Sequence, residues 1–89
     1  MGAWRLEWGS DRTDISFEQK FQKLEGSVTL GLTRGGLRDA QLHGTQINFA
    51  YVDDAGVRRD FSGRVSAGRM EGSFRADNGA EGRWSATKK

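Results

Sequence analysis

The sequence predicts an all-β fold, a small up-and-down antiparallel meander barrel of eight strands that is closed or nearly closed and has no helix. The clearest support is the stretch 61–74, where apolar and polar residues alternate with period two on both sides of a turn at Ala67-Gly68. Each half has a glycine at the centre of its apolar face, and the pattern of residues 70–74 recurs at 24–28. A glycine at mid-strand leaves room for a bulky neighbour. Thirteen glycines and no proline also suit many tight turns.

Length and composition indicate one domain, residues 1–89, near the size at which a single core is only just sufficient. Three Trp, five Phe and one Tyr supply much buried area per residue. There is no cysteine, so a disulfide framework and a catalytic or metal-binding thiolate are excluded. The formal net charge of +2 is too small to indicate nucleic-acid binding, and no apolar run has the ~18 residues of a membrane span. We expect a soluble monomer that binds neither nucleic acid nor membrane.

Residues 3–8 and 13–21 alternate and predict the first two strands, with turn-forming residues between them. The inward positions of the second strand include Gln19, the one polar side chain on an otherwise apolar face. The parity of apolar residues then flips, and a two-residue turn at Gln22-Lys23 restores the register. The next apolar set predicts the third strand and consists of Leu24, Gly26, Val28, Leu30 and Leu32.

The middle of the chain predicts a turn at Arg34-Gly35-Gly36 and a fourth strand at residues 37–44. The two leucines of this strand have opposite parity, which predicts a β-bulge near Asp39-Ala40. A two-residue hairpin turn at Gly44-Thr45 then leads into the fifth strand with the apolar residues on the same face.

Two loops set the register of the last strands. Residues 53–56 form a strong turn signal, and a three-residue loop with Gly56 in the left-handed conformation keeps the apolar faces aligned. Residues 77–79 predict another three-residue loop, which places Gly72 opposite Trp84. In an eight-stranded meander the first and last strands run antiparallel, so their pairing removes both sheet edges.

In these registers Trp4 lies level with Gln19, and large side chains face small ones across the barrel, as a narrow eight-stranded barrel requires. The interior has two interpretations. Its aromatic walls suggest a pocket for a small apolar ligand, with contacts from Trp4, Gln19, Tyr51 and Trp84. The number of large inward side chains favours a filled core instead, in which the amide of Gln19 bonds to the backbone or to an indole N–H.

The outer face is predicted to be solvated and to carry cross-strand charge pairs. Arg64 falls opposite Glu71, and Arg75 lies between Asp60 and Glu81. His43 is the only histidine, and a chain with one histidine and no cysteine lacks the usual zinc and Ser-His-Asp sites. We therefore expect no catalytic site, no bound metal and no cofactor in this domain. A weaker alternative, an interaction module, is left open by the arginines near loop ends, Arg34, Arg38, Arg58, Arg59 and Arg69.

Several short motifs carry a family resemblance over nearly the whole chain. They are Gly-x-Trp-Arg-Leu at residues 2–6, Gln-x-Phe-Gln-x-Leu-x-Gly at 19–26, Leu-x-Gly-x-Gln-Ile-x-Phe at 42–49, Gly-Arg-Val…Met-Glu-Gly at 63–72 and Trp-Ser-Ala-Thr at 84–87. The chain resembles the C-terminal β domain of bacterial class I S-adenosylmethionine-dependent methyltransferases. The Gly-x-Trp start followed by Gln…Gly is also similar to lipocalin-like and avidin-like barrels.

The resemblance implies an excised C-terminal domain whose partner is a preceding methyltransferase domain in the same polypeptide. The cofactor site of that family lies in the preceding domain, and no residue here corresponds to it. The expected role is then non-catalytic, aiding substrate presentation or the stability of the partner domain. The runner-up is a lipocalin-like binding module for a small apolar ligand. A bacterial source is implied, but cytoplasm and periplasm are not distinguished.

Overall fold

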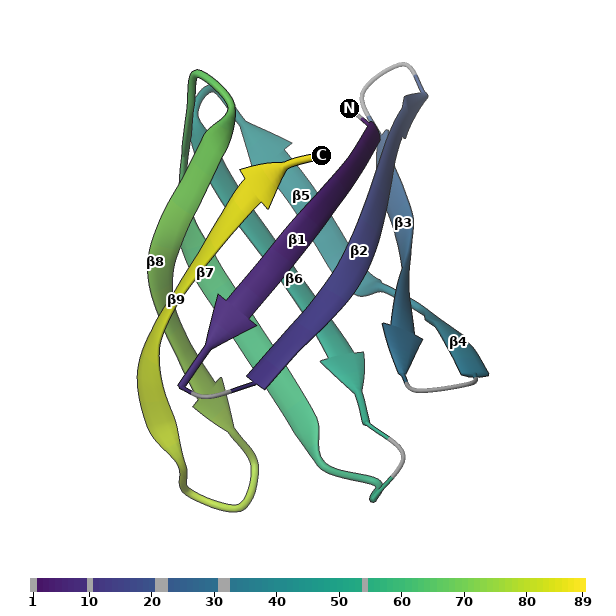
Figure 1. Cartoon of the computed structure of the whole chain (residues 1–89), viewed down its shortest axis with the longest axis vertical. Coiled ribbons are helices and arrows are strands. Elements are labelled where there is room, and N and C mark those ends of the chain that lie inside the picture. Colours follow the sequence, from purple (N-terminus) through teal and green to yellow (C-terminus); the bar gives the residue numbers. More distant parts are fainter. Residues whose placement is uncertain (1, 10, 21–22, 31–32, 54) are drawn as a thin grey trace.

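The computed structural model describes residues 2–9, 11–20, 23–30, 33–53 and 55–89. These residues form nine strands and include no helix, hence none long and apolar enough to cross a membrane (Figure 1). The strands are β1 (Gly2–Trp8), β2 (Asp11–Lys20), β3 (Lys23–Leu30), β4 (Thr33–Gly36), β5 (Arg38–His43), β6 (Gln46–Val52), β7 (Arg58–Ser66), β8 (Arg69–Ala76) and β9 (Glu81–Lys88).

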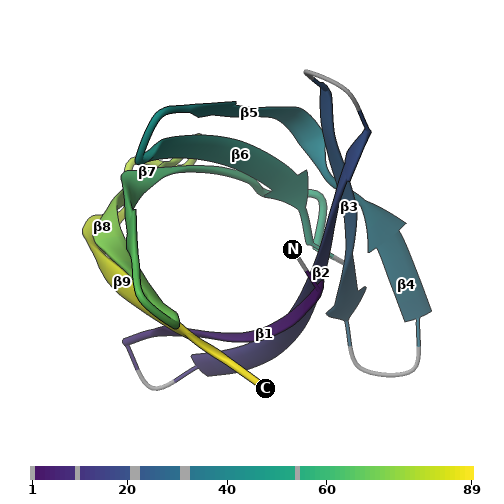
Figure 2. The same cartoon turned by 90° about the horizontal axis from the view of Figure 1, so that it is seen from above.

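All nine strands belong to one antiparallel sheet in the order β4-β3-β2-β1-β9-β8-β7-β6-β5. Viewed from above, the sheet curls into a nearly closed ring, with β3 and β4 flaring away from it (Figure 2). The first and last strands pair as predicted, and Trp8 lies opposite Trp84. The fold is therefore the all-β meander barrel that the alternation pattern predicts.

The registers predicted for the second half of the chain are confirmed. Gly72 lies opposite Trp84, and the loop before β9 has its glycine, Gly79, at a φ of 94°. Gly56 in the β6–β7 loop has a φ of 81°, the left-handed conformation expected there. The turn between β5 and β6 occupies Gly44-Thr45, because His43 and Gln46 pair across it.

The prediction for the fourth strand is wrong in one respect. Gly35 and Gly36 are not a turn but part of β4, paired with β3. After a single residue the chain continues as β5, and the predicted bulge is confirmed by a register shift between Arg38 and Gln41 and a φ of 52° at Asp39. One bent run of chain thus pairs first with β3 and then with β6, and the eight predicted strands become nine.

The prediction for the first two hairpins is also wrong. The predicted turn at Gln22-Lys23 would place Gln19 opposite Gly26, but Gln19 pairs with Leu24. Trp4 lies opposite Ile15 and not level with Gln19. β2 ends at Lys20, and Lys23, predicted in the turn, belongs to β3. Gln19 is exposed, although its partner Leu24 is only 5% exposed. Phe21 and Gln22 lie outside the described residues.

The core runs along the inside of the ring. Its buried residues come from every strand except the short β4 and β5, and burying each large apolar side chain contributes about 1.5–3 kcal/mol relative to exposure. The cluster consists of Trp4, Leu6, Ile15, Phe17, Leu24, Val28, Ile47, Phe49, Tyr51, Phe61, Met70, Trp84 and Ala86.

Candidate functional site

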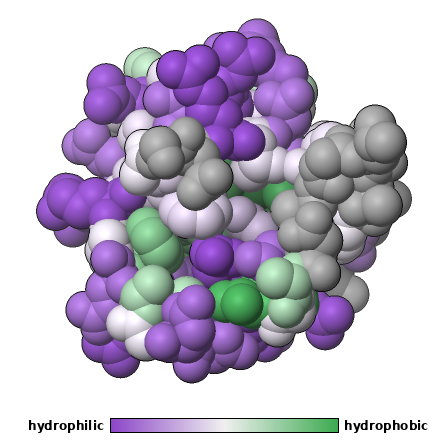
Figure 3. All heavy atoms as spheres, turned by 60° about the horizontal axis from the view of Figure 1, so that its bottom comes forward, coloured by the Kyte–Doolittle hydropathy of each residue, from purple (hydrophilic) through white to green (hydrophobic). Residues whose placement is uncertain are grey.

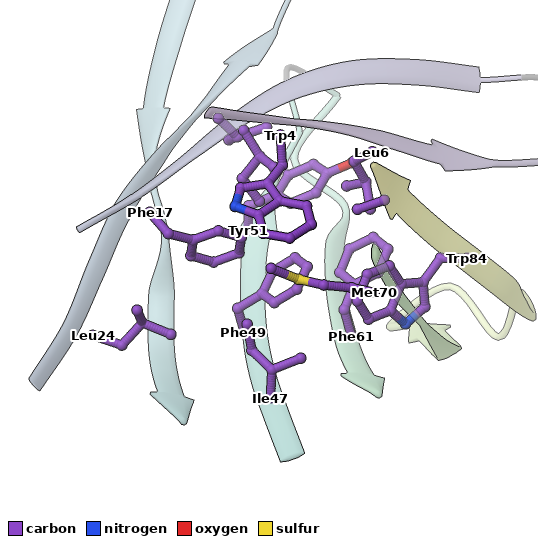
Figure 4. Packing of buried hydrophobic residues seen from close by; sticks show 13 residues of the cluster. Trp4, Leu6, Phe17, Leu24, Ile47, Phe49, Tyr51, Phe61, Met70 and Trp84 are labelled. Atoms are coloured by element: carbon purple, nitrogen blue, oxygen red, sulfur yellow. The ribbon is translucent and has the colours of Figure 1, made fainter. Parts of the chain in front are cut away.

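The interior contains three of the four side chains that the sequence suggests as ligand contacts. Trp4, Tyr51 and Trp84 are only 3%, 2% and 3% exposed. They point into the same space, with Met70 among them (Figure 4). Gln19 is exposed and does not join them. The structure therefore brings together an aromatic interior without the polar contact that was predicted for it.

Aromatic rings occupy the middle of this interior. Phe49 and Phe61 stack with their ring centroids 5.0 Å apart, and Tyr51 stacks on Phe61 at 5.4 Å. Trp84 meets both phenylalanines edge-on, at 5.4 and 5.8 Å. Stacked and edge-on contacts at these distances are the favourable arrangements of aromatic pairs. The chain's own side chains thus fill the place where a ligand of a lipocalin-like barrel would lie.

The indole of Trp84 is satisfied by the backbone of the neighbouring strands. Its Nε1 donates to the carbonyl oxygens of Ser62 and Ser73, at 3.1 and 3.0 Å. The indole can lie this close to the two strands only because glycines, Gly63 and Gly72, lie opposite each other in β7 and β8. A Cβ on Gly63 would come within 2.8 Å of the Trp84 ring, so a larger residue there would displace the indole.

Trp4 differs from Trp84 in its hydrogen bonding. Its Nε1 is buried and has no acceptor among the residues that the structure describes. An unpaired buried donor carries a desolvation cost of about 1–3 kcal/mol. Trp4 is therefore the point inside the barrel where a hydrogen-bond acceptor from outside the chain would be stabilised.

A second cluster lies at the lower end of the barrel in Figure 1, the end that Figure 3 brings forward. Arg59 forms an ion pair with Asp53, and its guanidinium carbon lies 4.6 Å from the centre of the Trp8 ring. The indole N–H of Trp8 donates to the hydroxyl of Tyr51 at 3.2 Å. A cation over an indole face is a favourable contact, so these four residues link the β6–β7 loop to β1.

The ion pair between Asp53 and Arg59 is the most buried one among the described residues. The two side chains are 16% and 13% exposed, whereas every other described ion pair is at least 37% exposed on both sides. The other carboxylate oxygen of Asp53 accepts the N–H groups of Ala55 and Val57, both at 2.9 Å. The hydrogen bond from Arg59 lowers the pKa of Asp53; burial opposes this shift, and the two backbone bonds reinforce it.

Sequence reasoning missed this cluster because it placed Arg59 with the solvated loop arginines. The available signal was parity, since Arg59 and Phe61 share one face of β7 and Phe61 is buried. A charged residue is usually exposed, but an arginine can bury its aliphatic stem and pair its guanidinium group.

The outer face of β6 to β9 has a hollow of about 740 Å³. At one end, Arg58 donates to Asp39 at 2.7 Å and to Asp60 at 3.0 Å, and these acids raise the pKa of Arg58 further above its usual value. The predicted pair of Arg75 with Glu81 is confirmed at 2.8 Å. The pair predicted between Arg64 and Glu71 is not formed. The two residues lie opposite each other, but the carboxylate of Glu71 contacts Arg69 at 3.5 Å instead.

Within the described part of the chain, no group of three or more His, Asp or Glu side chains lies close enough to hold a metal ion. The fold and these sites define the chain as a small antiparallel β-barrel with an aromatic interior and a polar, hollowed outer face. Comparisons with protein-family models, with curated proteins and with solved structures find no match to this chain.

Proposed function

We propose that this chain is a non-catalytic accessory β-barrel domain that acts through its outer surface. Following the resemblance of its motifs, its partner is the catalytic domain of an S-adenosylmethionine-dependent methyltransferase. The domain aids substrate presentation or the stability of that partner.

One observation carries this proposal: aromatic side chains of the chain itself fill the middle of the barrel. Small ligand sites are concave and leave space for the ligand between their walls. A barrel filled in this way has its outer face left for recognition, and that face has a hollow lined mostly by polar and charged residues. A scaffold with a packed core and a shaped exterior suits an accessory domain.

The test is isothermal titration calorimetry with S-adenosylmethionine, on the 89-residue barrel and on the complete product of its gene. We expect no heat of binding for the barrel and micromolar binding by the complete product. The proposal fails if the barrel alone binds the cofactor with micromolar affinity, or if the complete product does not bind it.

A second candidate is a lipocalin-like module for a small apolar ligand. The observation that favours it is the buried Nε1 of Trp4, which has no acceptor among the described residues. A ligand with one acceptor atom would satisfy this donor, but it would have to displace side chains that now pack beside it.

A further inference from the structure

A row of polar side chains, three of them short, crosses the outer face of the barrel. Asn48, Ser62, Ser73 and Arg83 come from β6, β7, β8 and β9, and each lies directly opposite the next. Longer side chains stand on both sides of the row. We call this feature the outer groove; it is the floor of the 740 Å³ hollow described above.

The dimensions of the outer groove suit an extended chain. Neighbouring strands lie about 4.8 Å apart, so a row across four strands is about 14 Å long. An extended polypeptide covers about 3.3 to 3.6 Å per residue, so the groove accommodates about four residues. A single small ion would occupy only a fraction of this length.

The groove offers more hydrogen-bond donors than acceptors. The acceptor oxygen of Asn48 already receives the hydroxyl of Ser62, at 2.7 Å. This leaves the amide N–H₂ of Asn48 and the hydroxyl of Ser73 without a bond to any residue that the structure describes. These unpaired donors therefore favour a ligand that offers several hydrogen-bond acceptors.

Two arginines carry positive charge at one side of the groove. Arg64 and Arg83 line one hollow together with both serines, and neither has an acidic partner among the described residues. The other cations beside the groove, Arg58 and Arg75, are already paired. Charges in the lining of the 740 Å³ hollow balance overall, because Asp39, Asp60 and Glu81 face Arg58, Arg75 and Arg83. Unpaired positive charge is concentrated where Arg64 and Arg83 meet the serines.

The floor of the groove is fixed from inside the barrel. The carbonyl oxygens of Ser62 and Ser73 both accept the N–H of Trp84. Since a Cβ at Gly72 would approach the carbonyl oxygen of Ser62 to 1.9 Å, only glycine allows the strands to lie this close. The serine row is consequently held by the core and is preorganised for a ligand.

We propose that the outer groove binds an acidic segment of extended polypeptide, with a carboxylate held between Arg64 and Arg83. This deepens and rests on the proposed function, because the segment would belong to the partner domain. The positive charge of Arg64 and Arg83 selects a carboxylate, and the length of the groove selects a chain of several residues. Bidentate hydrogen bonds from guanidinium to carboxylate give the contact geometric specificity.

The experiment titrates the 89-residue chain with acetylated and amidated tetraglutamate and follows backbone amides by ¹⁵N NMR. We expect saturable shifts at Ser62, Ser73 and Arg83, and an affinity at least fivefold weaker when the salt rises from about 0.05 M to about 0.5 M. Tetraglutamine should cause no saturable shift. The double variant Arg64→Gln/Arg83→Gln should lose at least tenfold in affinity while keeping its melting temperature, because both side chains are exposed.

The matched control is Arg5→Gln/Arg12→Gln, which changes the net charge equally at exposed positions on β1 and β2. It should bind tetraglutamate as the original chain does. The inference is overturned if both double variants lose affinity equally, if shifts map to other strands, or if inorganic phosphate binds the groove as tightly as the peptide. These outcomes do not depend on S-adenosylmethionine binding, so failure here is separable from failure of the proposed function.

Discussion

The indole of Trp84 rests against Gly63 so closely that a Cβ on the glycine would lie 2.8 Å from Cζ2 of the ring. The glycine opposite, Gly72, is even more confined, because its Cβ would approach the carbonyl oxygen of Ser62 to 1.9 Å. The two glycines thus let β7 and β8 lie close together while a large aromatic ring packs over them. The same contact supports both the packed interior and the floor of the outer groove.

Replacing Gly72 by alanine should therefore lower stability by about 3 kcal/mol, because a methyl group against a backbone oxygen can only be accommodated if the strands move apart. Gly36→Ala is the matched control, since a Cβ there meets no atom within 4 Å and its φ is not in the left-handed region. The control should change stability by less than about 0.5 kcal/mol. Urea unfolding measures the stability of both variants. Equal losses of stability would contradict the close contact between β7 and β8.

The two buried tryptophans should respond differently to loss of the indole N–H. Trp84→Phe leaves two carbonyl oxygens without this donor, whereas Trp4→Phe removes a donor that has no described acceptor. Both changes reduce ring size, so the difference between them isolates the hydrogen bonds. We expect Trp84→Phe to cost about 1–2 kcal/mol more than Trp4→Phe in thermal or urea unfolding. A larger cost at Trp4 would contradict this assignment.

Alternation of apolar residues was sufficient to predict the fold class and most strands. In the second half, each loop has a glycine that must adopt positive φ, and these glycines set the registers correctly. Gly56 and Gly79 are examples. In the first half Gly9, between β1 and β2, has a φ of 58°, but the sequence between β2 and β3, Phe21-Gln22, contains no glycine. A slip of two residues between β2 and β3 keeps every side chain on its face, so alternation alone could not distinguish Gln19 opposite Leu24 from Gln19 opposite Gly26.

The site was less predictable than the fold, because it depends on contacts between distant residues. Three interior aromatics followed from parity. The ion pair of Arg59 with Asp53 spans only six residues, but the Trp8 ring that Arg59 contacts comes from β1, far away in the sequence. The outer groove likewise depends on four strands in register. No single stretch of sequence contains it.

The ion pair between Asp53 and Arg59 should make stability depend on pH in the acid range. The pKa of Asp53 is lowered in the folded chain, so its contribution is present above the unfolded pKa of about 3.9 and is lost as the pH falls through the folded value. Asp53→Asn should cost about 1–3 kcal/mol at pH 7, because it leaves the mostly buried Arg59 unpaired. The cost should shrink below about pH 4.

The control for this change is Asp60→Asn, whose side chain is 59% exposed and bonds to Arg58. It should cost less than about 1 kcal/mol at pH 7. Urea unfolding of both variants at several pH values gives the comparison. A cost at Asp53 that does not change with pH would show that its charge contributes nothing.

Gln19→Leu should be nearly neutral, within about 0.5 kcal/mol of the original chain, because the side chain is exposed. The register predicted from sequence alone would bury this amide, and its loss would then cost about 1–3 kcal/mol. Differential scanning calorimetry decides between the two registers. A strongly lowered melting temperature would support the register predicted from the sequence and contradict the register in the structure.

The most direct test of the central claim, a filled barrel that acts through its exterior, is a fluorescence titration with the neutral apolar dye N-phenyl-1-naphthylamine. Because the aromatic stack around Phe49 and Phe61 occupies the interior, we predict no saturable rise in dye emission and no quenching of Trp4 or Trp84. One-to-one saturation at micromolar dye, with quenched tryptophan emission, would contradict the claim and favour the lipocalin-like binding module instead.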